Sequence, residues 1–214
     1  HRLVHYEVVI NSGGGIPREG RMLYIPGVQF RSGMYNTLEL LDEYFADPNY
    51  EQPFFWCEFL HAMGNGPGDI EDYWEVFWKH PGSCGGFVWE WTDHAIYKGV
   101  AENGKPIYFY GGDHGEFPHD GNFCMDGLVY PDRRPHTGLM EYKNVHRPLR
   151  AVYDMEKQVL VVENHLDFLD PADQISAAWS LTLDGTEIAG GSLPLPSIPP
   201  HTMREIPLSF FVPD

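Results

Sequence analysis

Glu58 is the residue of this 214-residue chain best placed to do chemistry. It ends the apolar run of residues 54–57, which has the length and unbroken apolar character of a parallel strand buried on both faces. Active sites of α/β proteins form at the carboxyl ends of such strands, because the loops converge there. A carboxylate in this position costs free energy unless it is paired or functional. Position alone therefore leaves open a catalytic carboxylate and an ion pair at the rim of a sheet.

Alternating strands and helices must position this carboxylate. Strand-like apolar runs cover residues 3–7, 28–35, 54–58 and 86–91. Helical patterns cover residues 38–45, 70–80 and 138–146. Repeated alternation of this kind predicts βα units around a parallel sheet.

The pattern changes after residue 147. Short strands are predicted at residues 151–153, 159–164, 175–183 and 206–212, with a hairpin turn at Asp184-Gly185 and an irregular crossing over the proline-rich residues 193–200. This is typical of an antiparallel β-sandwich. We therefore predict a βα domain over residues 1–147 and a partial β-sandwich over residues 148–214. The first is shorter than the roughly 250 residues of a complete (β/α)8 barrel, and the second is shorter than the roughly 100 residues of a sandwich.

The residues around Glu58 carry a longer pattern. The segment reads Cys57-Glu58-Phe59-Leu60-His61-Ala62-Met63-Gly64-Asn65. It resembles the nucleophile segment of the large bacterial β-galactosidases of glycoside hydrolase family 2, in which Tyr stands where this chain has Phe59. Further segments resemble the same family in the same order, at residues 85–93, 110–113, 122–129 and 134–136. The resemblance covers most of residues 1–147 and, more loosely, the sandwich.

The resemblance implies both a fold and a function. The fold would be α/β: the carboxyl-terminal half of a (β/α)8 TIM barrel, with about four βα units, followed by a truncated all-β immunoglobulin-like sandwich. The chain would be a fragment of a retaining β-galactosidase that hydrolyses terminal β-D-galactosides through a glycosyl-enzyme on Glu58. In the family the acid/base glutamate follows an Asn, and no Asn-Glu pair occurs here. We therefore expect the isolated chain to be inactive, and its open barrel edges predict self-association or pairing with the missing half.

The resemblance also assigns roles to residues around the nucleophile. Tyr35 would lie beside Glu58 and donate its hydroxyl proton to the carboxylate. The other expected substrate-binding residues are Met34, His61, Trp89 and Asp126.

A sodium site is a further implication of the resemblance. The backbone carbonyl of Phe123 and the side chain of Asp126 would hold sodium at the galactose 6-hydroxyl. Asp126 replaces the usual Asn of the family, so a different cation, or none, stays open. The magnesium ligands of the family lie outside this chain. Among nearby residues, Glu7, Glu90, Asp93 and Asp113 are expected to be structural or to support the site, Trp91 is expected in the core, and zinc is not expected on the loop 114–120.

Several of these residues also have a plainer interpretation. Tyr35 could be a core tyrosine, His61 a structural hydrogen-bonding residue, and Trp89 part of a barrel core. The whole chain could then be a non-catalytic galactoside-binding or structural module of the same fold. An Asn-Glu pair upstream in the parent reading frame would favour the enzyme, and a natural start near residue 1 would favour the module.

The amino-acid composition limits the kinds of partner that the chain is expected to bind. The chain has 14 Lys and Arg against 31 Asp and Glu, a formal net charge of −17, which argues against nucleic acid and against an anionic membrane surface. A neutral β-galactoside would be indifferent to this charge. The three cysteines have no metal-binding spacing and are expected to be reduced and buried. They favour the cytoplasm, while a periplasmic location stays open.

Overall fold

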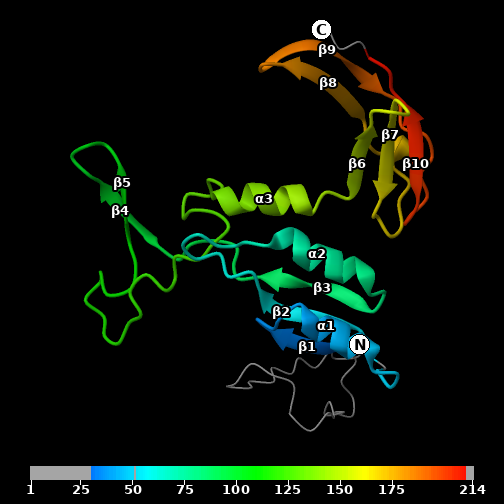
Figure 1. Cartoon of the computed structure of the whole chain (residues 1–214). Coiled ribbons are helices and arrows are strands. Elements are labelled where there is room, and N and C mark those ends of the chain that lie inside the picture. The colour runs from blue at the N-terminus through cyan, green and yellow to red at the C-terminus, as the bar shows by residue number, and fades with distance from the viewer. Residues whose placement is uncertain (1–29, 51, 211–214) are drawn as a thin grey trace. The chain divides into compact units, whose positions relative to one another are not determined.

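Three parallel strands form the sheet that carries Glu58. The computed structural model describes residues 30–50 and 52–210. The strands β1 (Arg31–Met34), β2 (Phe54–Phe59) and β3 (Ser83–Val88) pair in the order β1-β2-β3, all parallel (Figure 1). This confirms the parallel pairing predicted for the three later runs. The run at residues 3–7, with Glu7, lies outside the described residues.

Helices α1 (Glu39–Ala46), α2 (Ile70–Lys79) and α3 (Thr137–Val145) form close to the predicted ranges. Their apolar side chains pack with the sheet in one core, in which Trp56 of β2 is fully buried. The Trp56 ring lies 4.9 Å from the ring of Tyr73 and 5.6 Å from that of Phe77. Because Ile70, Tyr73 and Phe77 recur at helical spacing, α2 presents one apolar stripe to the sheet.

The opposite face of the sheet is also aromatic. Successive side chains of a strand point to opposite faces, so Phe55 of β2 lies on the face away from Trp56. Its ring is 5.9 Å from that of Phe87 on β3, and Phe87 is 65% exposed. The helices therefore cover one face of the sheet and leave these rings on the other.

The segment after β3 corrects two expectations. The strand was predicted to run over residues 86–91, but it ends at Val88, and Trp91 is 60% exposed rather than in the core. The cause is a change of partner. The Trp89 N–H still donates to the Phe59 carbonyl (3.1 Å), whereas the next N–H, that of Glu90, donates to the Asp126 carbonyl (2.9 Å).

A β-hairpin follows that sequence reasoning did not predict. Strands β4 (Ile96–Val100) and β5 (Pro106–Phe109) pair antiparallel. Most of their side chains are exposed, so the alternation that marks a half-buried strand is absent. The Asn103-Gly104 pair between them is a turn signal that could have indicated the hairpin.

The second unit of the chain is antiparallel, and the internal contacts divide the chain after Val145. The strands are β6 (Leu149–Asp154), β7 (Val159–Asn164), β8 (Ala177–Leu183), β9 (Thr186–Leu193) and β10 (Met203–Pro207), with a short 3-10 helix, η1 (Pro171–Asp173). One sheet has the order β10-β7-β6 and the other pairs β8 with β9. Side chains of both sheets meet in a core around Val162, Ile198 and Ile206. The predicted turn at Asp184-Gly185 joins β8 to β9, and β10 begins three residues before the predicted strand.

Two further features bear on the expectations from composition. The three cysteines are free thiols, but the expectation of buried thiols holds only for Cys57; it is wrong for Cys124, which is half-buried, and for Cys84, which is exposed. Its side chain lies on β3 at a position that the α2 core does not cover. Among the described residues, no helix has the length and apolar character needed to cross a bilayer.

Candidate active site

Glu58 and Tyr35 meet at the carboxyl ends of β2 and β1. Met34 pairs with Glu58 in the register of the two strands, and the Tyr35 N–H donates to the Glu58 carbonyl (3.0 Å). Burial, the negative charge of Glu58 and hydrogen-bonding interaction with its side chain raise the pKa of the Tyr35 hydroxyl above its ordinary value. Tyr35 therefore stays protonated at neutral pH and remains a donor to Glu58.

A second cluster gathers around the carboxylate of Asp126. The Trp89 indole N–H donates to Asp126 Oδ2 (3.0 Å), and His61 Nε2 lies 3.7 Å from the same oxygen. Asp126 is only 2% exposed. One buried carboxylate therefore links the strand end at Trp89 to the loop that carries His61.

Aromatic contacts connect the two clusters. The His61 ring lies 6.0 Å from the ring of Tyr35 and 5.4 Å from that of Phe123. Phe123 itself is 62% exposed. Every residue that the sequence singled out as a site residue is thus brought to the same end of the sheet.

Glu90 adds a second carboxyl group beside Asp126. Burial raises the pKa of Glu90, the ion pair with His94 (3.3 Å) lowers it, and the nearby Asp126 carboxyl raises it again. The net shift is upward. Because Asp126 stands where the family pattern has Asn, this chain places two carboxyl groups, those of Glu90 and Asp126, at this point.

Asp126 also offers an oxygen to a cation. Its Oδ1 atom is buried and receives no hydrogen bond from any described residue. Carboxylate and carbonyl oxygens are the ligands that hard cations prefer. The chemistry of Asp126 Oδ1 therefore fits a hard cation such as sodium. The described residues contain no group of three or more His, Cys, Asp or Glu side chains that could hold a metal.

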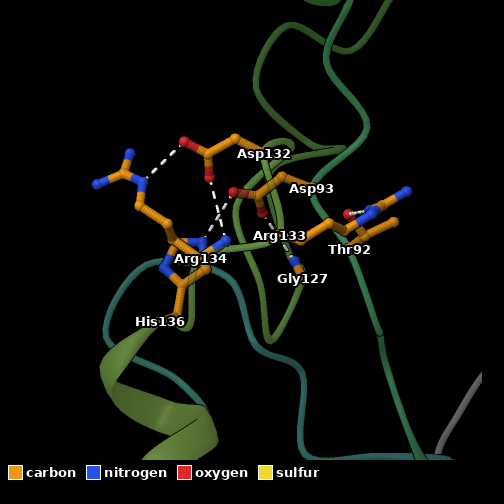
Figure 2. Close-up of polar contacts among 7 residues, drawn as sticks. All are labelled: Thr92, Asp93, Gly127, Asp132, Arg133, Arg134 and His136. Carbon is orange, nitrogen blue, oxygen red and sulfur yellow. Dashed lines mark hydrogen bonds and ion pairs between the residues drawn. The ribbon is translucent and has the colours of Figure 1, made fainter.

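Asp93 is a buried carboxylate with two partners from distant segments. Its Oδ1 accepts a hydrogen bond from the Gly127 N–H (2.9 Å), and its Oδ2 lies 2.8 Å from His136 Nε2 (Figure 2). Sequence reasoning named Asp93 as a supporting residue but did not find His136 or Gly127 as its partners. The spacing of these residues gives no signal, because the contacts join segments that are 34 and 43 residues apart.

The remaining acidic residues lie in local structure. Asp113 Oδ2 accepts from the Tyr110 N–H (3.0 Å), and Glu116 accepts from the Gly112 and His114 N–H groups. Burial is low on this loop. These carboxylates thus stabilise the turn, and their contacts indicate a structural rather than a catalytic role.

Comparisons with known proteins give the chain its family. Residues 1–151 match the family described as glycosyl hydrolases family 2, TIM barrel domain, and residues 160–214 match beta-galactosidase, domain 4. The beta-galactosidase of Actinobacillus pleuropneumoniae is 46% identical over 207 residues, which cover 97% of this chain and 19% of that protein. The beta-galactosidase of Staphylococcus xylosus is 41% identical over 217 residues, covering 99% of this chain and 21% of that protein.

The class of protein follows from two observations: a carboxylate at the end of a strand in the parallel sheet, and the match to a barrel domain. Together they define a glycoside hydrolase with a barrel domain. The chain belongs to glycosyl hydrolase family 2, and its relatives there are β-galactosidases. It contains residues of the family's TIM-barrel domain followed by residues of beta-galactosidase domain 4, and the latter form two antiparallel sheets. It spans about one fifth of the length of the two relatives.

Proposed function

We propose that the protein to which this chain belongs is a retaining β-galactosidase and that Glu58 is its nucleophile. The observation that supports this best is the placement of Tyr35 beside Glu58 at the paired ends of β1 and β2, where the two side chains interact. A nucleophilic carboxylate must be ionised and held in one orientation, and a fixed O–H donor serves both needs.

The reaction would proceed in two displacements. A Glu58 carboxylate oxygen attacks the anomeric carbon, and the bond from that carbon to the aglycone oxygen breaks. An acid/base carboxyl group from outside this chain protonates the leaving oxygen. The same group then takes a proton from a water molecule that attacks the anomeric carbon, and the bond from that carbon to Glu58 breaks to release galactose and the free carboxylate. In retaining enzymes the two carboxyl groups are about 5–5.5 Å apart.

The cluster around Asp126 would bind the galactosyl ring. The Trp89 indole would lie under the apolar face of the sugar, with its orientation fixed by the bond to Asp126. His61 would contact ring hydroxyls, and Met34 would line the site beside Glu58. Asp126 and the Phe123 carbonyl would hold sodium, which supplies a positive charge to the sugar hydroxyl; the magnesium expected in the complete enzyme would be bound elsewhere.

We further propose that the chain is the carboxyl-terminal half of the barrel, with about four βα units, followed by part of an immunoglobulin-like sandwich. The acid/base glutamate is then missing, because the chain has no Asn-Glu pair. Isolated, the chain would be inactive.

The decisive experiment is complementation. The chain is co-produced with the amino-terminal part of the Actinobacillus β-galactosidase, and hydrolysis of nitrophenyl-β-galactoside is measured with and without that partner. Activity is expected only with the partner. Glu58→Gln should abolish it, whereas Glu43→Gln, the same change at an exposed position of α1, should leave it intact.

Three results would count against the proposal. Activity that survives Glu58→Gln would remove the nucleophile assignment. Activity of the isolated chain would remove the claim of a missing acid/base. A folded complex that binds galactose but never hydrolyses galactosides would favour the non-catalytic binding module.

The open sheet suggests an association partner. β1 and β3 are the edges of the described sheet, and Phe87 is exposed on the face away from the helices. Unpaired edges and exposed rings favour pairing with another chain. We propose that the isolated chain self-associates and that the amino-terminal half replaces the second copy. A monomer in size-exclusion chromatography at micromolar concentration would refute this.

A further inference from the structure

We propose that Asp93 and His136 act as positioning residues that hold the loop carrying Asp126 at the active site. The inference rests on the proposed function, because it takes Asp126 and Trp89 as substrate-binding residues. Asp93, Gly127 and His136 are called the Asp93 clasp below (Figure 2).

The clasp closes a strand-like pairing between two segments. Residues 90–93 run beside residues 126–129, and Thr92 and Val129 form a parallel bridge. The Leu128 N–H donates to the Glu90 carbonyl (2.8 Å), and the Asp93 N–H donates to the Val129 carbonyl (3.0 Å). Asp126 therefore stands at the first position of this pairing, and any shift of the loop moves its carboxylate.

Gly127 shows how close the two segments lie. A Cβ atom at this position would overlap the backbone of Thr92 and Asp93. The Asp93 carboxylate fixes this approach, because its Oδ1 accepts the Gly127 N–H one residue after Asp126. The side chain of Asp93 is only 2% exposed, so water does not compete for this bond.

His136 ties the far end of the loop to the same carboxylate. Its Nε2 lies 2.8 Å from Asp93 Oδ2, and its N–H donates to the Leu128 carbonyl (3.0 Å). The ring stacks on Tyr130 with a centroid distance of 3.7 Å. His136 also directly precedes α3. The buried side chain of Asp93 therefore holds three segments together: the start of this helix, the loop that carries Asp126, and the turn after β3.

This arrangement distinguishes the clasp from the groups that touch substrate. Both Asp93 oxygens bind protein groups, neither of which is an assigned site residue. Asp93 therefore acts through Asp126 and the Trp89 indole bound to it. Loss of the clasp should weaken substrate binding more than it slows the chemical step on Glu58.

The test uses the complemented enzyme and the variants Asp93→Ala, Asp93→Asn and His136→Ala. For Asp93→Ala we expect KM for nitrophenyl-β-galactoside to rise roughly 10- to 100-fold, because a displacement of about 1 Å in a binding group has effects of this size, while kcat stays within about threefold of the parent value. Asp93→Asn keeps an acceptor for Gly127 and offers an N–H to His136, so it should restore most of the affinity. Asp113→Ala, the loss of an exposed aspartate on a neighbouring loop, is the matched control and should leave KM unchanged.

A second readout needs no activity. In amide hydrogen exchange of the chain, peptides covering residues 122–130 should exchange faster in Asp93→Ala, while those covering β2 and α2 keep the parent rates. If the unmodified complex does not hydrolyse galactosides, the proposed function fails, and this exchange pattern still decides whether the clasp holds the loop.

The opposing outcomes are equally distinct. A purely structural role would lower the active fraction, and so the apparent kcat, with KM unchanged. A KM within about twofold of the parent in Asp93→Ala, or unchanged exchange over residues 122–130, would overturn the proposal. If Asp93→Ala does not fold, His136→Ala decides, because it removes one partner of the clasp, and an unchanged KM there would also overturn it.

Discussion

The interaction of the Tyr35 hydroxyl with the Glu58 side chain gives a quantitative prediction for Tyr35→Phe. The substitution removes one hydroxyl group and leaves the ring, which lies 6.0 Å from that of His61. The nucleophile then loses a donor that holds it in one orientation. We expect kcat of the complemented enzyme to fall about tenfold.

The magnitude follows from the surroundings of the bond. A hydrogen bond to a charged group contributes about 1.5–3 kcal/mol. Tyr35 is 44% exposed, so water can replace part of this interaction and the lower limit of about 1.5 kcal/mol applies. Since about 1.4 kcal/mol corresponds to a factor of ten in rate, the expected loss is about tenfold.

The fall in kcat caused by Tyr35→Phe should not depend on pH. The pKa of Tyr35 is raised above its ordinary value by burial and by Glu58, so the hydroxyl remains protonated through the alkaline range in which the enzyme can be assayed. The ratio of parent to variant kcat should therefore be the same at pH 7 and at pH 9. A ratio that shrinks towards pH 9 would mean that Tyr35 ionises and would contradict this picture.

Tyr97→Phe is the matched control, because Tyr97 is 57% exposed on the β4–β5 hairpin. A kcat within twofold of the parent for Tyr35→Phe, or an equal loss in Tyr97→Phe, would refute the reasoning.

Three further predictions concern other parts of the chain. Gly127→Ala should lower galactoside affinity at least about tenfold, because the added Cβ displaces the loop from Thr92 and Asp93; unchanged KM would contradict the close approach. Asp126→Asn should raise the sodium concentration needed for half-maximal activity at constant ionic strength, since a neutral amide oxygen replaces the carboxylate; an unchanged requirement would place sodium elsewhere. Burial lowers the pKa of His146 from 6.5 to about 4, so the unfolded chain takes up this proton first as the pH falls. The free energy of unfolding in urea should therefore decline between pH 6.5 and pH 4, and a decline of the same size in His146→Gln would disprove this origin.

The elements that bury a regular apolar pattern were predictable from sequence. Residues 54–58 and 70–80 show it directly, because the unbroken apolar run became β2 and the helical spacing became α2. The β4–β5 hairpin was missed because its strands are mostly exposed and show no alternation. Trp91 was expected in the core because strand periodicity was extended past Val88, where the backbone in fact changes partner.

The candidate site was predictable only in part. A local motif marked Glu58 and His61, and the structure places them with Tyr35, Trp89 and Asp126 at one end of the sheet. The partners of Asp93 could not be found in this way. A buried carboxylate needs hydrogen-bond donors, but nothing in the sequence tells which of the eleven histidines supplies one. Contacts between distant segments depend on how the backbone folds, so no fixed spacing of residues marks them in a single sequence.

The distance along the chain between Tyr35 and His136 has a consequence for the order of events during folding. About a hundred residues separate them, and contacts of such long sequence separation form slowly because the loop must be closed first. Glu58 leaves the ribosome well before the loop that carries Asp126, so the strand that bears the nucleophile can pair with its neighbours while the sugar-binding side is still being synthesised. In the proposed enzyme, hydrolysis would begin only when the last of these segments has docked in the complex with the amino-terminal half, and turnover in a refolding experiment would report completion of the fold rather than formation of the sheet.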